Sequence, residues 1–117
     1  MVMGVGVDMV KIEKIISAIN KWGDSFIDRV FDEKELKHIA KGKMYYQRIA
    51  ARFAAKEAVI KAVSKDYPLA LKDIFILNKD NGAPYCEFRN NVNLDIFLSI
   101  THIEDYAVAC AVAQKKT

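Results

Sequence analysis

Three side chains in this sequence have types and spacings that could do chemistry. Asp8 ends the apolar stretch "GVGVD" and is followed directly by further apolar residues. A carboxylate in such surroundings is costly to bury unless a positive group meets it. Glu57 and Lys61 lie four residues apart in "RFAAKEAVIKA", so a helix there would place both on one face. An ion pair that stabilises the helix by ~0.3–0.5 kcal/mol explains this spacing without any function.

A fourth candidate, His102, lies in "SITHIEDYA" at the expected end of a strand. Strand ends and the loops after them commonly carry sites, although a single histidine is more often a surface or hydrogen-bonded residue. The pair Gly4 and Gly6 suggests a dinucleotide-binding turn, but the third glycine of G-x-G-x-x-G would fall at Met9. That interpretation is therefore excluded.

The first half of the chain must position Asp8, Glu57 and Lys61, and its patterns predict one strand and three helices. Valines favour a short buried strand over residues 2–7 that ends near Asp8. Isoleucines at helical spacing predict a helix over 10–22. The capping-box spacing of "DEKEL" predicts a second helix over about 32–44, and an alanine-rich stretch predicts the longest helix over 48–64.

The second half is predicted to form strands. Two β-rich runs within 73–89 flank Asn81-Gly82, which is a strong hairpin signal. Two more strands are expected over 97–102 and 106–113, joined by a short polar turn. Helices thus concentrate in the first half and strands in the second. This segregation indicates an α+β fold, with the helices packed on an antiparallel sheet in a single domain over 1–117.

Composition limits the protein class further. With 117 residues, of which 52% are hydrophobic and 28% charged, the chain is typical of one soluble globular domain. It contains neither a run approaching the ~18 apolar residues of a membrane span nor a signal-peptide pattern, so we expect a cytoplasmic protein. Cys86 and Cys110 lie outside any CxxC pair and are expected to be free, partly buried thiols.

The net charge of +3 is too small to indicate nucleic-acid binding by itself. Lysines and arginines nevertheless cluster at 11–14, 34–48 and 52–65. Such a basic helical half suits phosphates or an acidic protein, and it equally suits ordinary solvated helix faces.

Four segments of the chain together resemble a known enzyme family. The blocks "GVGVDMVKIEKI", "ARFAAKEAVIKA" and "SITHIEDYAVACAVA", with "NKDNGAPY" as an NGxP hairpin, are similar to those of holo-acyl-carrier-protein synthase. This is the short, trimeric type of 4′-phosphopantetheinyl transferase. The resemblance implies that type's α+β fold and a role in fatty acid biosynthesis. It implies transfer of 4′-phosphopantetheine from coenzyme A to a serine of apo-acyl carrier protein, with release of adenosine 3′,5′-bisphosphate.

The same resemblance implies roles for five residues. Asp8 and Glu57 match the two ligands of a catalytic Mg²⁺, a cation that typically takes one or two protein carboxylates. Lys61 would reach the pyrophosphate of coenzyme A, and His102 would contact the phosphates nearby. Arg52 matches a basic position at the nucleotide end of coenzyme A, where its 3′-phosphate lies. The proton acceptor stays open among Glu57, a metal-bound water and another carboxylate.

The acidic carrier protein gives the basic helices a partner. The resemblance implies docking on "KIEKIISAINKW", where Lys14 replaces a family arginine, and on Arg29 in "FIDRVF". It also implies a homotrimer with active sites between subunits. Two departures are a family Thr or Ser that is Ile103 here, and a short segment over 88–99 in which a helix is reduced to a turn.

A second class of protein is a non-catalytic binding module that docks acidic partners through its basic helices. Such a module would be indifferent to coenzyme A and to divalent metal, whereas the enzyme requires both.

Overall fold

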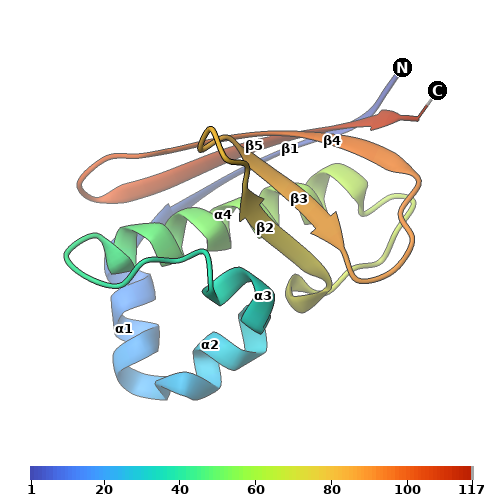
Figure 1. Cartoon of the computed structure of the whole chain (residues 1–117). Coiled ribbons are helices and arrows are strands. Elements are labelled where there is room, and N and C mark those ends of the chain that lie inside the picture. The colour runs from blue at the N-terminus through green and yellow to red at the C-terminus, as the bar shows by residue number, and fades with distance from the viewer. Residues whose placement is uncertain (117) are drawn as a thin grey trace.

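The computed structural model describes residues 1–116, and its largest sheet joins the two ends of the chain. Strands β1 (Val2–Lys11), β5 (Tyr106–Lys115) and β4 (Leu94–His102) are antiparallel in the order β1-β5-β4. The first strand therefore lies beside the last, and the two termini lie close together (Figure 1).

One long helix packs across one face of this sheet (Figure 1). The shorter helices lie on the side of that helix that faces away from the sheet (Figure 1). The helices are α1 (Ile12–Trp22), α2 (Asp24–Val30), α3 (Glu33–Leu36) and α4 (Tyr45–Val63). Because α4 has neighbours on both sides, its residues are buried almost all round, which a helix between two layers requires.

A hairpin completes the second layer. The 3₁₀ helix η1 (Leu71–Asp73) leads into β2 (Ile74–Asn78), which pairs with β3 (Pro84–Phe88) in a separate two-stranded sheet. A segment without helix, 89–93, then connects β3 to β4.

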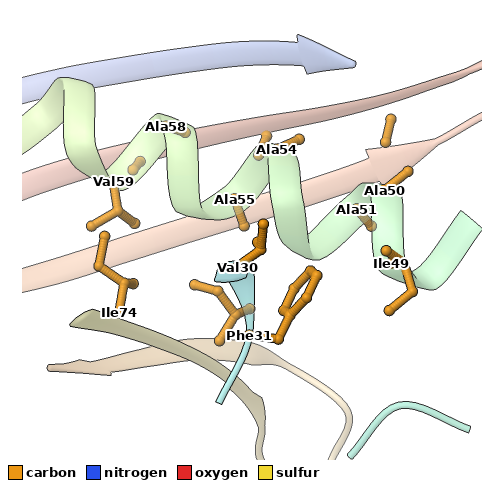
Figure 2. Close-up of a cluster of buried hydrophobic side chains, with 14 of the residues drawn as sticks. Val30, Phe31, Ile49, Ala50, Ala51, Ala54, Ala55, Ala58, Val59 and Ile74 are labelled. Carbon is orange, nitrogen blue, oxygen red and sulfur yellow. The ribbon is translucent and has the colours of Figure 1, made fainter. Parts of the chain in front are cut away.

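The core lies on both sides of α4, and Figure 2 shows part of it. Small side chains along α4 allow the sheet and the hairpin layer to approach closely. Val59 points towards Ile74 of β2, while Val30 and Phe31 at the end of α2 approach the helix beside Ala55 (Figure 2).

The two faces of the large sheet differ in their surroundings. The face towards α4 carries small residues from β5 that are almost fully buried, namely Ala107, Ala109, Ala111 and Ala113. The opposite face of β1 presents Val5, Val7 and Met9, each more than half exposed. Phe97 of β4 is likewise 57% exposed. This outer face is apolar and uncovered in the single chain.

Most of the predicted elements are confirmed. The α+β class, the long helix, the hairpin around Asn81-Gly82 and the last two strands all occur. The hairpin loop spans 79–83, with Gly82 at φ 89°. The capping box of α3 is also present: the Asp32 side chain accepts from the Lys34 N–H and Glu35 accepts from the Asp32 N–H.

Four element predictions are wrong in extent or missing. β1 continues through Asp8 to Lys11 and is exposed on one face, so α1 begins at Ile12. The apolar outer face hid the alternation that marks a half-buried strand. The helix predicted over 32–44 ends at Leu36, and Gly42 in the loop after it has φ 120°. Helix α2 was not predicted; it follows Gly23, which has φ 56°.

Two smaller expectations concern cysteines and membranes. Cys86 and Cys110 are free and partly buried, as predicted, and burial raises the pKa of the Cys86 thiol to about 12. Within residues 1–116, no helix is long and apolar enough to cross a bilayer.

Candidate active site

The structure brings Asp8, Glu57 and Lys61 together where β1 crosses α4. The Lys61 Nζ donates to Asp8 Oδ1 at 3.1 Å and to the Val7 carbonyl at 3.0 Å. The Asp8 side chain is only 17% exposed, so Lys61 supplies the positive group that its surroundings require. Asp8 lies in the middle of β1, whereas the sequence predicted it at the end of a shorter strand.

Glu57 completes this group from one turn earlier on α4. Partial burial raises the pKa of Glu57, the nearby Asp8 charge raises it further, and Lys61 lowers it. The charge of Asp8 therefore acts on Glu57 across the junction of strand and helix. The ion pair between Glu57 and Lys61 that the helical spacing suggested does not form within residues 1–116, because Lys61 pairs with Asp8 of β1 instead.

Close packing of β1 on α4 makes this junction possible. A Cβ on Gly6 would overlap the Ala58 carbonyl oxygen, and a Cβ on Gly4 would overlap that of Ala62. Both clashes involve helix backbone, which cannot move aside as a side chain can. The absence of side chains at these positions lets α4 lie near enough for Lys61 to reach β1.

His102 lies on the same face of the sheet as Asp8 but is not in contact with it. Asp8 pairs with Ala109 and His102 pairs with Ala107, so β5 separates the two residues. Two strand spacings across the sheet and an offset of two residues along it place their Cα atoms roughly 12 Å apart. His102 is exposed, and among residues 1–116 it makes no side-chain hydrogen bond. A single chain does not bring His102 into the carboxylate group.

Arg52 occupies another side of α4. It precedes Glu57 by five residues, which places it roughly 140° around the helix. Its Nη2 donates to Asn78 Oδ1 at 2.5 Å, at the end of β2 where the hairpin loop begins. Its Nε is buried and has no hydrogen-bond partner within the described chain, and burial lowers the pKa of the guanidinium. Arg52 thus belongs to the hairpin side rather than to the carboxylate group.

The two predicted docking residues lie exposed on neighbouring helices. Lys14 is on α1, and Arg29 is in the last turn of α2. Lys14 lines a cavity of about 470 Å³ whose other lining residues are mostly apolar: Met9, Val10, Lys11, Ile15, Ala18, Phe26, Phe53 and Tyr106. Phe53 is one turn before Glu57, so this groove adjoins the carboxylate group.

The sequence did not predict this groove, although most of the apolar residues that line it are present in the predicted helices and the segment between them. Phe26 and Phe53 stack with ring centroids 6.2 Å apart and line it together with Ile15. The Ile12 N–H also donates to the Asp105 carbonyl, which ties the start of α1 to the β4–β5 turn. These contacts depend on tertiary packing that spacing along the chain does not show.

A buried ion pair, which the sequence did not predict either, lies on the side of α4 that faces the hairpin and the end of α2. Lys56 donates to Glu35 at 2.6 Å and to the backbone carbonyls of Val30, Leu71 and Ile74. Burial lowers the pKa of Lys56, and Glu35 opposes that shift. Both side chains have no exposed surface, so this pair is structural and joins α4 to β2 and the end of α2.

Another cavity, of about 800 Å³, lies away from these residues. It opens beside the short 89–93 connection and is lined by residues from β3 and β4, including Cys86, Phe88 and Leu94. None of the predicted site residues lines it. Its size alone gives it no chemical role.

The donor set at the junction suits a hard divalent cation. Asp8 and Glu57 offer carboxylate oxygens, which Mg²⁺ prefers. Residues 1–116 contain no group of three or more potential ligands, so a cation here would take the rest of its coordination from water or from a substrate. Two protein carboxylates and open positions are the arrangement found where Mg²⁺ also binds phosphate oxygens.

Two relatives match almost the whole chain. A protein of Thermodesulfovibrio yellowstonii described as holo-[acyl-carrier-protein] synthase is 42% identical over 112 residues, covering 96% of this chain and 98% of that protein. A protein of Caldicellulosiruptor saccharolyticus with the same description is 40% identical, with 99% of each chain covered.

Solved structures agree with these relatives. A holo-(acyl-carrier-protein) synthase from Bacillus anthracis, in complex with CoA (3′,5′-ADP), has a TM-score of 0.86 and 31% identity over 99% of both chains. A Helicobacter pylori holo-[acyl-carrier-protein] synthase in complex with coenzyme A has a TM-score of 0.83 and 26% identity, covering 94% of this chain and 99% of that one. The model of one family, described as the 4′-phosphopantetheinyl transferase superfamily, matches residues 4–111. On this evidence the chain belongs to the 4′-phosphopantetheinyl transferase superfamily.

Proposed function

We propose that this protein is a Mg²⁺-dependent holo-acyl-carrier-protein synthase. It transfers 4′-phosphopantetheine from coenzyme A to a serine of apo-acyl carrier protein and releases adenosine 3′,5′-bisphosphate, in support of fatty acid biosynthesis. The observation that carries the proposal is the junction of Asp8, Glu57 and Lys61 in a chain of this superfamily. The relatives' descriptions and the coenzyme A bound to two similar structures support the same substrates.

Asp8 and Glu57 would hold the Mg²⁺, whose charge neutralises the diphosphate of coenzyme A when the ion is bound. Lys61 lies one turn beyond Glu57, within reach of the same phosphates. Its ammonium would stabilise the negative charge that develops on the leaving group. No nucleophile is needed on this chain, because the attacking serine belongs to the carrier. The residue that accepts the serine proton stays unassigned.

Arg52 and His102 are proposed to bind other parts of coenzyme A. The buried Nε of Arg52, which has no hydrogen-bond partner among residues 1–116, supports contact with an anionic group such as the 3′-phosphate. His102 is proposed to donate to the phosphates. Its separation from Asp8 within one chain supports a site completed by a neighbouring subunit.

Lys14 and Arg29 are proposed to dock the acidic carrier. Both are exposed cations on the helical layer, and Lys14 borders the groove that adjoins Glu57. Complementary charge there would speed association and make turnover sensitive to salt.

We further propose a cytoplasmic homotrimer. The uncovered outer face of the sheet, with Val5, Val7 and Met9 exposed beside Phe97 on β4, is the kind of apolar patch that marks an interface between proteins.

The decisive experiment measures the intact mass of an apo-acyl carrier protein after incubation with this protein, coenzyme A and Mg²⁺. The expected result is a mass gain of one phosphopantetheine group. The gain should disappear with chelator and with the Asp8→Ala or Glu57→Ala variant, each checked for an intact fold by circular dichroism. A carrier whose mass never changes, with a protein that still binds it, would instead support the non-catalytic binding module.

A further inference from the structure

Lys61 makes two hydrogen bonds that tie α4 to β1. Its Nζ lies 3.1 Å from Asp8 Oδ1 and 3.0 Å from the Val7 carbonyl oxygen. The lysine side chain is 53% exposed, so it has room to adopt another rotamer. Within residues 1–116, no lysine or arginine forms an ion pair with Glu57. Lys61 is therefore held on Asp8 and not on Glu57.

We propose that Lys61 occupies the place of the divalent cation beside Asp8, and that the arrival of the metal displaces the lysine from β1. This inference rests on the proposed metal site of Asp8 and Glu57. A lysine ammonium and a divalent ion on one carboxylate would lie only about 4–5 Å apart, because Mg²⁺–oxygen bonds are ~2.1 Å long. Their mutual repulsion favours one cation at a time.

The exchange keeps Asp8 compensated in both states. Asp8 is largely shielded from water, and an uncompensated carboxylate there would be costly. Without metal, Lys61 neutralises it; with metal, the divalent ion does so. The released ammonium is a point charge on a flexible four-carbon stem, anchored one turn from Glu57, so it becomes available to a phosphate oxygen at the moment the cation is in place. Metal binding and the release of Lys61 towards the phosphates thus occur together.

Removal of the competing lysine should strengthen metal binding in the absence of coenzyme A and carrier. We expect Lys61→Met to bind Mn²⁺ ~3–5-fold more tightly than the unaltered protein, as measured by water-proton relaxation during a MnCl₂ titration. Lys65→Met is the matched control. It removes the same charge from an exposed side chain four residues further on, where no ion pair forms in the described chain. Its affinity for Mn²⁺ should stay close to that of the unaltered protein.

A second measurement follows the lysine itself and excludes a purely long-range effect of charge. In protein labelled with ¹³C-lysine, the Lys61 Cε resonance is identified by its absence from Lys61→Met. The Asp8→Ala variant, without metal, gives the position of a released Lys61. Addition of MgCl₂ to the unaltered protein should move the Lys61 resonance towards that position and leave the Lys65 resonance in place.

The outcomes separate this inference from the proposed function. Equal or weaker Mn²⁺ binding by Lys61→Met, or a Lys61 resonance that stays fixed while metal binds, overturns the exchange alone if transfer to the carrier still requires Mg²⁺. Failure of both the unaltered protein and Lys61→Met to bind any divalent cation, with the carrier still modified in the presence of chelator, overturns the metal site and the exchange together.

Discussion

Lys56 of α4 and Glu35 of α3 form an ion pair that water does not reach: their charged atoms lie 2.6 Å apart and neither side chain has exposed surface. Glu35 also accepts from the backbone N–H groups of Asp32 and Ile76, through its two oxygens. Between them the two side chains satisfy backbone groups from α2, α3, η1 and β2. The pair therefore joins the helical layer and the hairpin to α4.

Loss of one charge from this pair should destabilise the fold strongly. We expect Glu35→Gln to lower the free energy of unfolding by about 3–5 kcal/mol, because Lys56 would be left buried without its counter-charge. Chemical denaturation measures the change. Glu33→Gln, the same substitution at an exposed position of α3, should change stability by less than about 0.5 kcal/mol. Comparable effects of the two substitutions would contradict the assignment.

Replacement of both members by apolar residues should not restore stability. The double variant Glu35→Leu/Lys56→Met removes both charges, yet it leaves the carbonyls of Val30, Leu71 and Ile74 without their donor. Unsatisfied buried groups cost roughly 1–3 kcal/mol each. A double variant as stable as the unaltered protein would mean that these carbonyls find other partners.

Gly6 should be intolerant of even one methyl group. Its added Cβ would overlap the Ala58 carbonyl oxygen, so Gly6→Ala must push β1 away from α4. We expect a loss of about 1–3 kcal/mol in the free energy of unfolding and a larger relative loss of transferase turnover, because Lys61 and Glu57 move away from Asp8. Trimming the helix with Ala58→Gly in the same chain should not rescue either property, since the clash involves backbone. If Ala58→Gly restored stability or turnover, the clash would involve the Ala58 side chain and not its carbonyl oxygen.

The carboxyl group of Glu57 should titrate above the usual range of a glutamate. Its raised pKa has burial as the larger cause and Asp8 as the smaller one. Asp8→Asn should therefore lower the pKa of Glu57 only part of the way to an ordinary value, as followed by the Cδ resonance in NMR titrations. The folded state holds the Glu57 proton more tightly than the unfolded state does. This group thus lowers stability as the pH rises from the ordinary pKa through the raised one. An ordinary pKa for Glu57 in both the unaltered protein and Asp8→Asn would show that Asp8 does not act on Glu57.

Charge reversal at Lys14 should act on the carrier and not on coenzyme A. We expect Lys14→Glu to raise the KM for acyl carrier protein about ten-fold at low salt, with the KM for coenzyme A within about two-fold of the original. Steady-state assays over a range of salt concentrations measure both constants. Lys65→Glu makes the same charge reversal beyond the end of α4, outside both α1 and the groove, and is the matched control. An altered KM for coenzyme A alone would place Lys14 at the nucleotide.

A charge on the outer face of the sheet should dissociate the proposed trimer. Val7 is 55% exposed in the single chain and lies beside Val5 and Met9 on the same face. We expect Val7→Lys to elute as a monomer, with light scattering giving its mass, and to lose turnover if each site needs a neighbour. Lys65→Glu, an exposed charge reversal beyond the end of α4, should keep the original mass. A monomeric unaltered protein with full activity would exclude a shared site.

Local spacing predicted which residues lie together at the junction better than it predicted the bounds of the elements that carry them. Glu57 and Lys61 follow from helical geometry, and Asp8 from a carboxylate among apolar residues. The pairing of Lys56 with Glu35, 21 residues apart, depends on how α3 folds back onto α4, and no pattern within either helix specifies it. The partner of Arg52 likewise depends on tertiary packing, because only the packed hairpin brings Asn78 to it. The length of β1 was underestimated because its outer face is apolar, which removes the alternation that sequence interpretation relies on.

The pairing of the first strand with the last also sets when the site can assemble. Asp8 lies opposite Ala109, so its position becomes fixed only after β5 has been synthesised and has paired with β1. Contacts between such distant parts of a chain form late and slow folding. During synthesis on the ribosome, the first strand must wait, with its valines exposed, for nearly the entire chain to emerge. A nascent chain that stops before Tyr106 carries both carboxylates and yet has no strand to hold Asp8 against the helix.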